Sequence, residues 1–175
     1  YSLSNLEEIT LFTGQNTDEL LPAKAYSSAN GLFLKTKIPV FQDYRNLNQS
    51  YQIKFGDFGL INPSAAVEFK ISPKLVARVD TEFTNAHGNY KYRYTNGVYD
   101  TTVVRQNGDV LFNRIEATVF HQVDSAQKLQ YQAYQYSSQR GLPGAIVSNK
   151  YEFSQRLWDR TFFTQIQYLN KLSEI

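Results

Sequence analysis

Alternation of apolar and polar residues at a period of two constrains the fold of this chain most strongly. From about Ser50, apolar residues occupy every second position, as in Tyr51, Ile53 and Phe55. A β-strand places alternate side chains on opposite faces of a sheet, so this period predicts strands with one apolar and one polar face. Five further runs follow the pattern, the fifth of the six being weaker because glutamines interrupt it; they lie at 65–71, 75–83, 111–119, 128–136 and 158–168.

The composition favours sheet and excludes membrane-spanning helices. Tyr (13) and Phe (12) are abundant, and aromatic residues favour strands. Although 42% of the residues are hydrophobic, no uninterrupted apolar run exceeds three residues, whereas a spanning helix needs about 20. A spanning strand needs apolar side chains only at alternate positions, so the composition leaves a membrane β-barrel open.

The segments between the predicted strands differ in length in a regular way. Short polar turns are expected at 72–74, 124–127 and 170–174, long segments at 86–107 and 137–155, and an intermediate join at Asn62 and Pro63. Outer-membrane barrels alternate short periplasmic turns with longer extracellular loops. The sequence therefore predicts an all-β fold, an antiparallel meander of about six long strands from a transmembrane β-barrel. A soluble β-sandwich is the alternative, although its strands are usually shorter.

The first forty residues lack this long alternation. Short strands are expected at 6–13 and 30–37, and the segment 18–28 between them could form a helical turn or a loop. We therefore expect a small α+β segment at 1–40 and the strand-rich part at 41–175.

Four segments resemble the TonB-dependent outer-membrane receptors of diderm bacteria. Asn5–Gly14 and Gly31–Lys37 resemble strands of the plug domain of these receptors. Tyr136–Ala145, followed by Arg156–Phe163, resembles an early barrel strand, its loop and the returning strand. The resemblance implies that 1–40 is the C-terminal part of a plug domain and that 41–175 holds the first strands of the barrel. The loop at 16–28 lacks the glycine-rich stretch of many family members.

The family resemblance also implies a function and a location. Such a receptor in the bacterial outer membrane binds a scarce nutrient outside the cell and admits it when an inner-membrane complex pulls on the plug. The expected nutrient is a ferric siderophore, haem or cobalamin. The expected partners are the remainder of the same barrel, the inner-membrane TonB complex through a plug region not present here, the small-molecule nutrient and outer-membrane lipid.

Six strands are fewer than the 22 that the resemblance implies, so we expect the chain to be a piece of a longer protein. Six strands cannot close a wide barrel, and open sheet edges in lipid cost several kcal/mol for each unsatisfied backbone group. A complete eight-stranded barrel is an alternative. It would need two further spanning strands from residues 1–40, whose pattern does not supply them.

Neither an enzyme nor a nucleic-acid-binding protein is expected. The net charge is +2, from 18 basic and 16 acidic residues mixed along the chain, which gives no basic stripe for nucleic acid. The absence of cysteine excludes thiolate metal ligands and cysteine nucleophiles. His87 and His121 are not paired with a nucleophile, and Asp57-Phe58-Gly59 lacks every other kinase element. We therefore expect no catalytic residue, metal or cofactor.

Candidate ligand-binding residues lie in the long segments. Arg140 opens the turn motif Arg140–Gly144, where it either solvates the rim or places a guanidinium for an anionic substrate. Tyr99, Arg105 and Tyr151 also lie toward these segments, where aromatic residues form either an interfacial girdle or a ligand contact.

Charged residues of the predicted strands form a second candidate set. They occupy the positions opposite the apolar face and would most simply face the barrel lumen. A different class of function, a soluble or periplasmic β-sheet module that binds carbohydrate through exposed tyrosines, stays open, as does a purely structural small barrel. The predicted lumen network comprises Arg78, Asp80, Glu82, Arg114 and Glu116.

Overall fold

The computed structural model of the chain describes residues 5–13, 30–42, 44–145 and 154–171. The described residues are mostly antiparallel β-sheet, which confirms the all-β class. The chain divides into two compact units, Tyr1–Val40 and Phe41–Ile175. Within the described residues, no helix is both long and apolar enough to cross a membrane.

The first unit contains a two-stranded antiparallel sheet of β1 (Leu6–Thr13) and β2 (Asn30–Thr36). Ile9 pairs with Leu34 and Leu11 with Leu32, and the register shifts between Leu6 and Glu8. The segment 18–28, for which we expected a helical turn or a loop, lies outside the described residues. The α+β character of this unit and its assignment to a plug domain therefore stay predictions.

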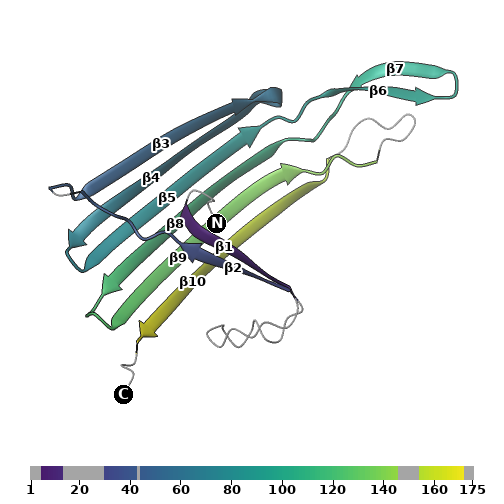
Figure 1. Ribbon diagram of the computed structural model, residues 1–175. Helices are drawn as coiled ribbons and strands as arrows, with labels where there is room; N and C mark the ends of the chain where they lie inside the picture. Colours follow the sequence, from purple (N-terminus) through teal and green to yellow (C-terminus); the bar gives the residue numbers. More distant parts are fainter. Residues whose placement is uncertain (1–4, 14–29, 43, 146–153, 172–175) are drawn as a thin grey trace. The chain divides into compact units, whose positions relative to one another are not determined.

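The second unit contains a six-stranded antiparallel sheet in the order β10-β9-β8-β5-β4-β3 (Figure 1). Strands that follow one another along the chain are neighbours in the sheet, apart from a separate hairpin inserted between β5 and β8, so the sheet is a meander as expected. The strands are β3 (Leu47–Gly56), β4 (Leu60–Ser72), β5 (Leu75–Ala86), β8 (Val110–Gln122), β9 (Gln127–Gly141) and β10 (Arg156–Asn170).

Register keeps the two faces of this sheet distinct. Val67, Val79 and Ala117 are partners in successive strands, and so are Glu68, Arg78 and Thr118 one residue away. The apolar face carries Leu47, Tyr51, Ile53, Phe55, Ile61, Ala65, Val67, Phe69, Leu75, Ala77, Val79, Phe83, Leu111, Ile115, Ala117, Val119, Leu129, Tyr131, Ala133, Trp158, Phe162, Ile166 and Tyr168. The polar face carries Asn48, Ser50, Gln52, Lys54, Asn62, Ser64, Glu68, Arg78, Asp80, Glu82, Thr84, Arg114, Glu116, Thr118, Gln130, Gln132, Ser138, Asp159, Thr161 and Gln165.

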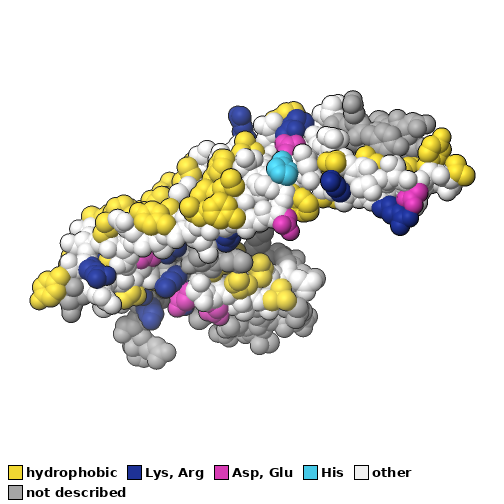
Figure 2. Space-filling view, turned by 90° about the horizontal axis from the view of Figure 1, so that it is seen from above, with side chains coloured by type: hydrophobic (Ala, Val, Ile, Leu, Met, Phe, Trp, Pro, Cys, Tyr) yellow, Lys and Arg dark blue, Asp and Glu magenta, His cyan; other side chains and the backbone are white. Residues whose placement is uncertain are grey.

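Burial in this sheet is the reverse of that in a water-soluble sheet. Arg78 is 6% exposed and Glu116 is 1% exposed, whereas Ile53 and Phe162 on the apolar face are 60% and 72% exposed. Apolar side chains gather along one flank of the molecule in Figure 2. An antiparallel sheet with one face in water normally buries its apolar face and exposes its polar one. Here the side chains that need hydrogen-bond partners are the buried ones.

At one end of the sheet the described connections between strands are all short, and at the other end lie the long connections. At the short-turn end, Pro73 and Lys74 join β4 to β5, and residues 123–126 join β8 to β9, which confirms two of the predicted turns. Asp124 shapes the second turn, because its Oδ1 accepts hydrogen bonds from the backbone N–H groups of Ala126 (2.8 Å) and Gln127 (2.7 Å). The opposite end, which we call the long-connection end, carries the short connection 57–59 and the two long connections that follow Ala86 and Gly141. The predicted turn at 170–174 lies mostly outside the described residues.

The join predicted at Asn62 and Pro63 is wrong, because both residues lie inside β4. The chain turns instead at η2 (Asp57–Gly59), where Phe58 and Gly59 have φ of 60° and 69°. The β4–β5 ladder has no partners at positions 62 and 63, as expected where proline lacks an N–H group. The Asn62 side chain spans this gap by donating to the carbonyl of Phe83 at 3.0 Å.

The long segment predicted at 86–107 contains a second β-hairpin. Its strands are β6 (Lys91–Asn96) and β7 (Tyr99–Val104), which pair from Lys91 with Val104 to Asn96 with Tyr99. Gly97 and Val98 form the two-residue turn, and Gly97 has a φ of 59° that suits glycine. The tyrosines here continue the period of two, so this segment is paired strand rather than open loop.

The close approach of Gly88 and Gly108 at the base of this hairpin gives a matched test. A Cβ atom on Gly88 would lie 2.1 Å from the Gly108 carbonyl oxygen, whereas one on Gly97 would meet nothing within 4 Å. Both glycines have positive φ, so both Gly→Ala changes carry the conformational cost of about 1–2 kcal/mol. We expect Gly88→Ala to lower the denaturant midpoint of unfolding clearly more than Gly97→Ala. Equal shifts would contradict the close approach.

Candidate functional site

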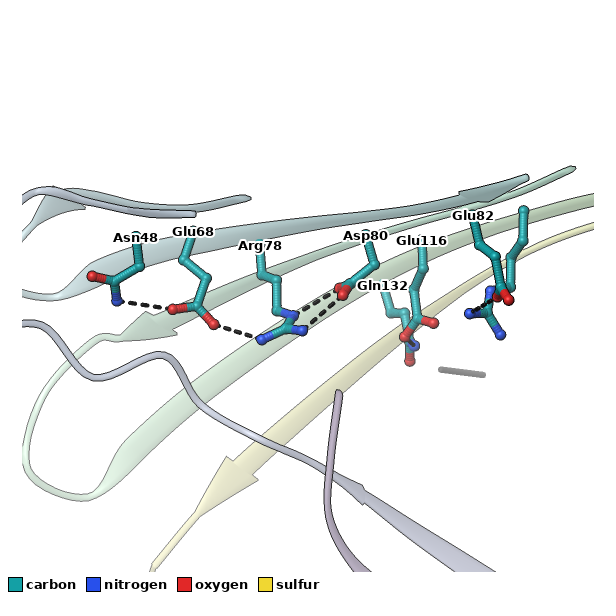
Figure 3. Close-up of polar contacts among 8 residues, drawn as sticks. Asn48, Glu68, Arg78, Asp80, Glu82, Glu116 and Gln132 are labelled. Carbon is teal, nitrogen blue, oxygen red and sulfur yellow. Dashed lines mark hydrogen bonds and ion pairs between the residues drawn. The ribbon is translucent and has the colours of Figure 1, made fainter. Parts of the chain in front are cut away.

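A chain of charge-assisted hydrogen bonds crosses three strands on the polar face (Figure 3). Asn48 Nδ2 donates to Glu68 Oε2 at 2.9 Å, and Arg78 Nη1 donates to Glu68 Oε1 at 2.5 Å. Arg78 also donates through Nε and Nη2 to the two carboxylate oxygens of Asp80, each at 2.7 Å. We call Asn48, Glu68, Arg78 and Asp80 the Arg78 network.

Strand geometry explains how the Arg78 network forms. Glu68 and Arg78 are register partners across β4 and β5, and Arg78 and Asp80 are two residues apart on one face. The two-pronged contact uses the planar guanidinium as a fork that matches the carboxylate. Burying charges is costly unless they are paired and hydrogen-bonded, and this network pairs each of them.

A second cluster lies nearer the long-connection end of the same face. Glu82 forms an ion pair with its register partner Arg114 of β8. Asn62 Nδ2 donates to Glu82 Oε1 at 3.0 Å and to Thr84 Oγ1 at 2.5 Å. The cluster therefore joins β4, β5 and β8 through one acidic side chain.

Glu116 connects β8 to β9 and lies between the other two clusters. Its Oε1 accepts a hydrogen bond from Gln132 Nε2 at 2.7 Å, and its register partner in β5 is Asp80. Arg78 balances the charge of Asp80, and Gln132 supplies a donor to Glu116. Asp80 and Glu116 can therefore occupy neighbouring positions although both are acidic.

All five residues of the predicted lumen network lie on one face of two described strands, β5 and β8. That this face lines a lumen stays a prediction. Sequence reasoning missed the partners that complete the clusters, although the parity of Glu68 already placed it opposite Val67. The cross-strand register selects these partners, which are Asn48, Asn62, Glu68 and Gln132.

Two side chains tie the long connections together at their base. Arg105 is buried, and its Nη2 donates to the carbonyls of Pro143 and Gly144, each at 2.6 Å. Asn107 Nδ2 donates to the carbonyls of Leu142 (3.1 Å) and Gln155 (2.6 Å). Asn107 therefore contacts residues at both ends of the connection between β9 and β10. We call Arg105, Asn107 and the backbone carbonyls that accept their hydrogen bonds the loop neck.

An ion pair between Arg156 and Asp109 closes the loop neck on its other side. Arg156 Nη1 and Nη2 lie 3.0 and 2.5 Å from the two carboxylate oxygens of Asp109. Hydrogen bonding to this guanidinium favours the charged carboxylate and holds the pKa of Asp109 below its usual 3.8. The loop neck is therefore an assembly of charge and backbone contacts that depends on an ionised Asp109.

The predicted ligand residues occupy different environments at the long-connection end. Tyr99 is 69% exposed at the tip of the β6–β7 hairpin. Arg140 is half-exposed and pairs with Asp159 at 3.2 Å. Arg105 donates hydrogen bonds to the carbonyls of Pro143 and Gly144, and it therefore lies against the segment that follows Arg140. Tyr151 lies outside the described residues. A ligand contact at any of these four positions stays a prediction.

The described residues contain no group of three or more His, Cys, Asp or Glu side chains that could hold a metal ion. No protein-family model matches the sequence, and no curated protein matches it either. The functional argument therefore rests on the inverted faces of the sheet and on the residues that its two ends bring together.

Removing Arg78 should destabilise the sheet strongly. Arg78→Gln leaves the buried Glu68 and Asp80 without their cation, and breaking a buried ion pair in this way typically costs about 3–5 kcal/mol. The matched control is Arg93→Gln, which breaks the exposed pair with Asp100 in the hairpin and should change stability little. Equilibrium unfolding in denaturant measures both variants. A similar small effect from the two would show that the Arg78 network contributes no more than a surface pair.

Acid should loosen the loop neck through Asp109. A carboxyl whose pKa is lowered in the folded state stabilises the fold above its ordinary pKa of 3.8 and loses that contribution as the pH falls through the lowered value. Trp158, the single tryptophan, lies two residues beyond Arg156 and reports the change by its fluorescence. Asp109→Asn should remove this acid transition and Asp100→Asn should retain it. A transition that survives in Asp109→Asn would assign it to another group.

Proposed function

We propose that the six-stranded sheet is part of the wall of a transmembrane β-barrel in a bacterial outer membrane. Its apolar face meets lipid and its polar face meets the lumen. The observation that carries the proposal is the inverted burial: exposed side chains such as Ile53 and Phe162 lie on one face, and paired charges such as Arg78 and Asp80 are buried on the other.

The energy of the apolar face supports a lipid environment. Burying a Val, Leu, Ile or Phe side chain away from water stabilises a protein by about 1.5–3 kcal/mol, and this face carries many such side chains. Soluble monomers rarely expose contiguous apolar patches larger than a few hundred Å². In the hydrocarbon of a bilayer, these side chains would not be exposed to water, so the face would carry no such cost. The polar face would be costly there, since lysine or arginine facing lipid at mid-membrane costs about 2–4 kcal/mol.

Strand length and connection order also support this proposal. A tilted spanning strand needs about 9–11 residues, and β5, β8, β9 and β10 have 12, 13, 15 and 15. The two-residue and four-residue turns lie at one end, as periplasmic turns do, and the two long connections lie at the other end, together with the three-residue connection 57–59.

The open edges imply a further partner for this sheet. Among the described residues, β3 and β10 each pair with one neighbouring strand only. Unpaired backbone groups in hydrocarbon cost several kcal/mol each, so a spanning sheet needs further strands on both sides. We infer that the remainder of the same barrel supplies them.

The finer proposal is a TonB-dependent receptor that takes up a scarce nutrient of the ferric siderophore, haem or cobalamin class. Its support is the order of the four sequence segments that resemble this family. On this proposal 1–40 is the end of the plug and 41–175 begins the barrel. Nutrient contacts with exposed residues such as Tyr99 would favour the plug state on which the inner-membrane TonB complex can pull.

Two adjacent alanines allow the barrel proposal to be tested by an identical substitution on each face. Ala65 lies on the apolar face and Ala66 on the polar face of β4, and the chain has no cysteine of its own. We expect a spin label at Ala65→Cys in bilayer-reconstituted protein to collide with lipid-soluble oxygen. Labels at Ala66→Cys, and at the less buried Ser64→Cys, should be shielded from it. A label at position 65 enclosed by protein would favour the soluble carbohydrate-binding module, whose apolar face packs against a second layer.

The receptor proposal is tested in the protein as cells make it. We expect the protein to fractionate with the outer membrane, and the purified protein to bind one member of a panel of ferric siderophores, haem and cobalamin. Uptake of that nutrient should cease in cells that lack the inner-membrane TonB complex. Recovery in a soluble fraction would contradict the barrel, whereas membrane localisation without TonB-dependent uptake would contradict the receptor alone.

A further inference from the structure

Arg160 is a cation on the apolar face of the sheet. It is exposed in β10 and shares this face with Trp158 and Phe162. Within the described residues its guanidinium makes no hydrogen bond and no ion pair. The other arginines in described strands are paired with carboxylates; they are Arg78, Arg93, Arg114, Arg140 and Arg156. Arg160 thus has a charge that no carboxylate among the described residues balances.

Uncharged polar side chains lie beside Arg160 on the neighbouring strands of the sheet. Its partner in β9 is Ser137, whose partner in β8 is Asn113. Gln135, two residues from Ser137, is exposed on the same face. Asn113, Gln135, Ser137 and Arg160 therefore form a polar patch on three neighbouring strands, which we call the Arg160 patch. Each member can donate a hydrogen bond, and none carries a negative charge.

The position of the Arg160 patch suits the surface of a bilayer rather than its centre. Arg160 is four residues from the start of β10 at the long-connection end. Trp158 lies beside it on the same face, and tryptophan is enriched at membrane interfaces. Toward the short-turn end, the same strands carry Ala117, Val119 and Tyr131. An arginine facing lipid costs about 2–4 kcal/mol at mid-membrane and about 0–1 kcal/mol near the interface, where a counter-charge is available.

We propose that the Arg160 patch binds the phosphate of an anionic lipid headgroup in the leaflet at the long-connection end. The guanidinium matches a phosphate with two parallel donors, and Ser137, Asn113 and Gln135 supply neutral donors around it. The proposal rests on the proposed function, since it requires the apolar face to meet lipid. It adds a specific lipid partner to the general contact with the membrane.

The test compares lipid retention by the intact protein after reconstitution in mixed phosphatidylcholine and phosphatidylglycerol. Native mass spectrometry of protein released from the bilayer measures the bound lipid. We expect retention of phosphatidylglycerol over phosphatidylcholine, and a loss of about tenfold in that preference in Arg160→Gln. Arg93→Gln removes a cation from the β6–β7 hairpin and should leave the preference unchanged. Asn113→Arg, which adds a cation to the patch, should strengthen it.

Three results would overturn the lipid site. They are equal preference in Arg160→Gln and the unaltered protein, a preference that Asn113→Arg does not raise, and displacement of phosphatidylglycerol by inorganic phosphate, which would show a site for free anions. Flotation with vesicles separates this failure from failure of the barrel proposal. A protein that does not float contradicts both, whereas one that floats and retains lipid without Arg160 contradicts the lipid site alone.

Discussion

The second unit depends on hydrogen bonds and ion pairs between the buried charged side chains of its polar face. Arg78 donates two hydrogen bonds to Asp80 and a third to Glu68, and Glu82 contacts both Arg114 and Asn62. A sheet cannot bury ionised side chains without partners of this kind, because the desolvation of each would exceed the stability of a domain. With the polar face paired internally, the opposite face carries the apolar residues, and many of them are exposed.

The period of two was sufficient to predict the six strands of the large sheet and the two faces of most of them, because alternate residues of a strand lie on opposite faces. Val67 and Glu68 fall on opposite faces as expected. Pro63 was misleading, since proline ordinarily marks a turn or an edge, and here the Asn62 side chain supplies a donor that the backbone lacks. The β6–β7 hairpin was missed as paired structure because its strands are short and its tyrosines resemble an interfacial girdle.

The candidate site was less predictable than the fold, because its contacts depend on register and on segments distant in sequence. Sequence parity places Glu116 on the polar face, but only the β8–β9 register assigns it Gln132. Arg105 was expected among ligand contacts, and the structure commits its guanidinium to carbonyls 38 and 39 residues away. That no described carboxylate pairs with Arg160 is similarly invisible in the sequence, since the pairing of the other arginines in described strands depends on cross-strand contacts.

The meander order of the sheet has a consequence for assembly. Each acidic residue of the polar face finds a donor on its own strand or on an adjacent one: Glu68 meets Arg78 of β5, Glu82 meets Arg114 of β8, and Glu116 meets Gln132 of β9. A strand that joins the growing edge therefore brings the partner of a charge already in place. Such a sheet can grow in chain order with short loop closures, and at each step the newest edge is the template for the next strand.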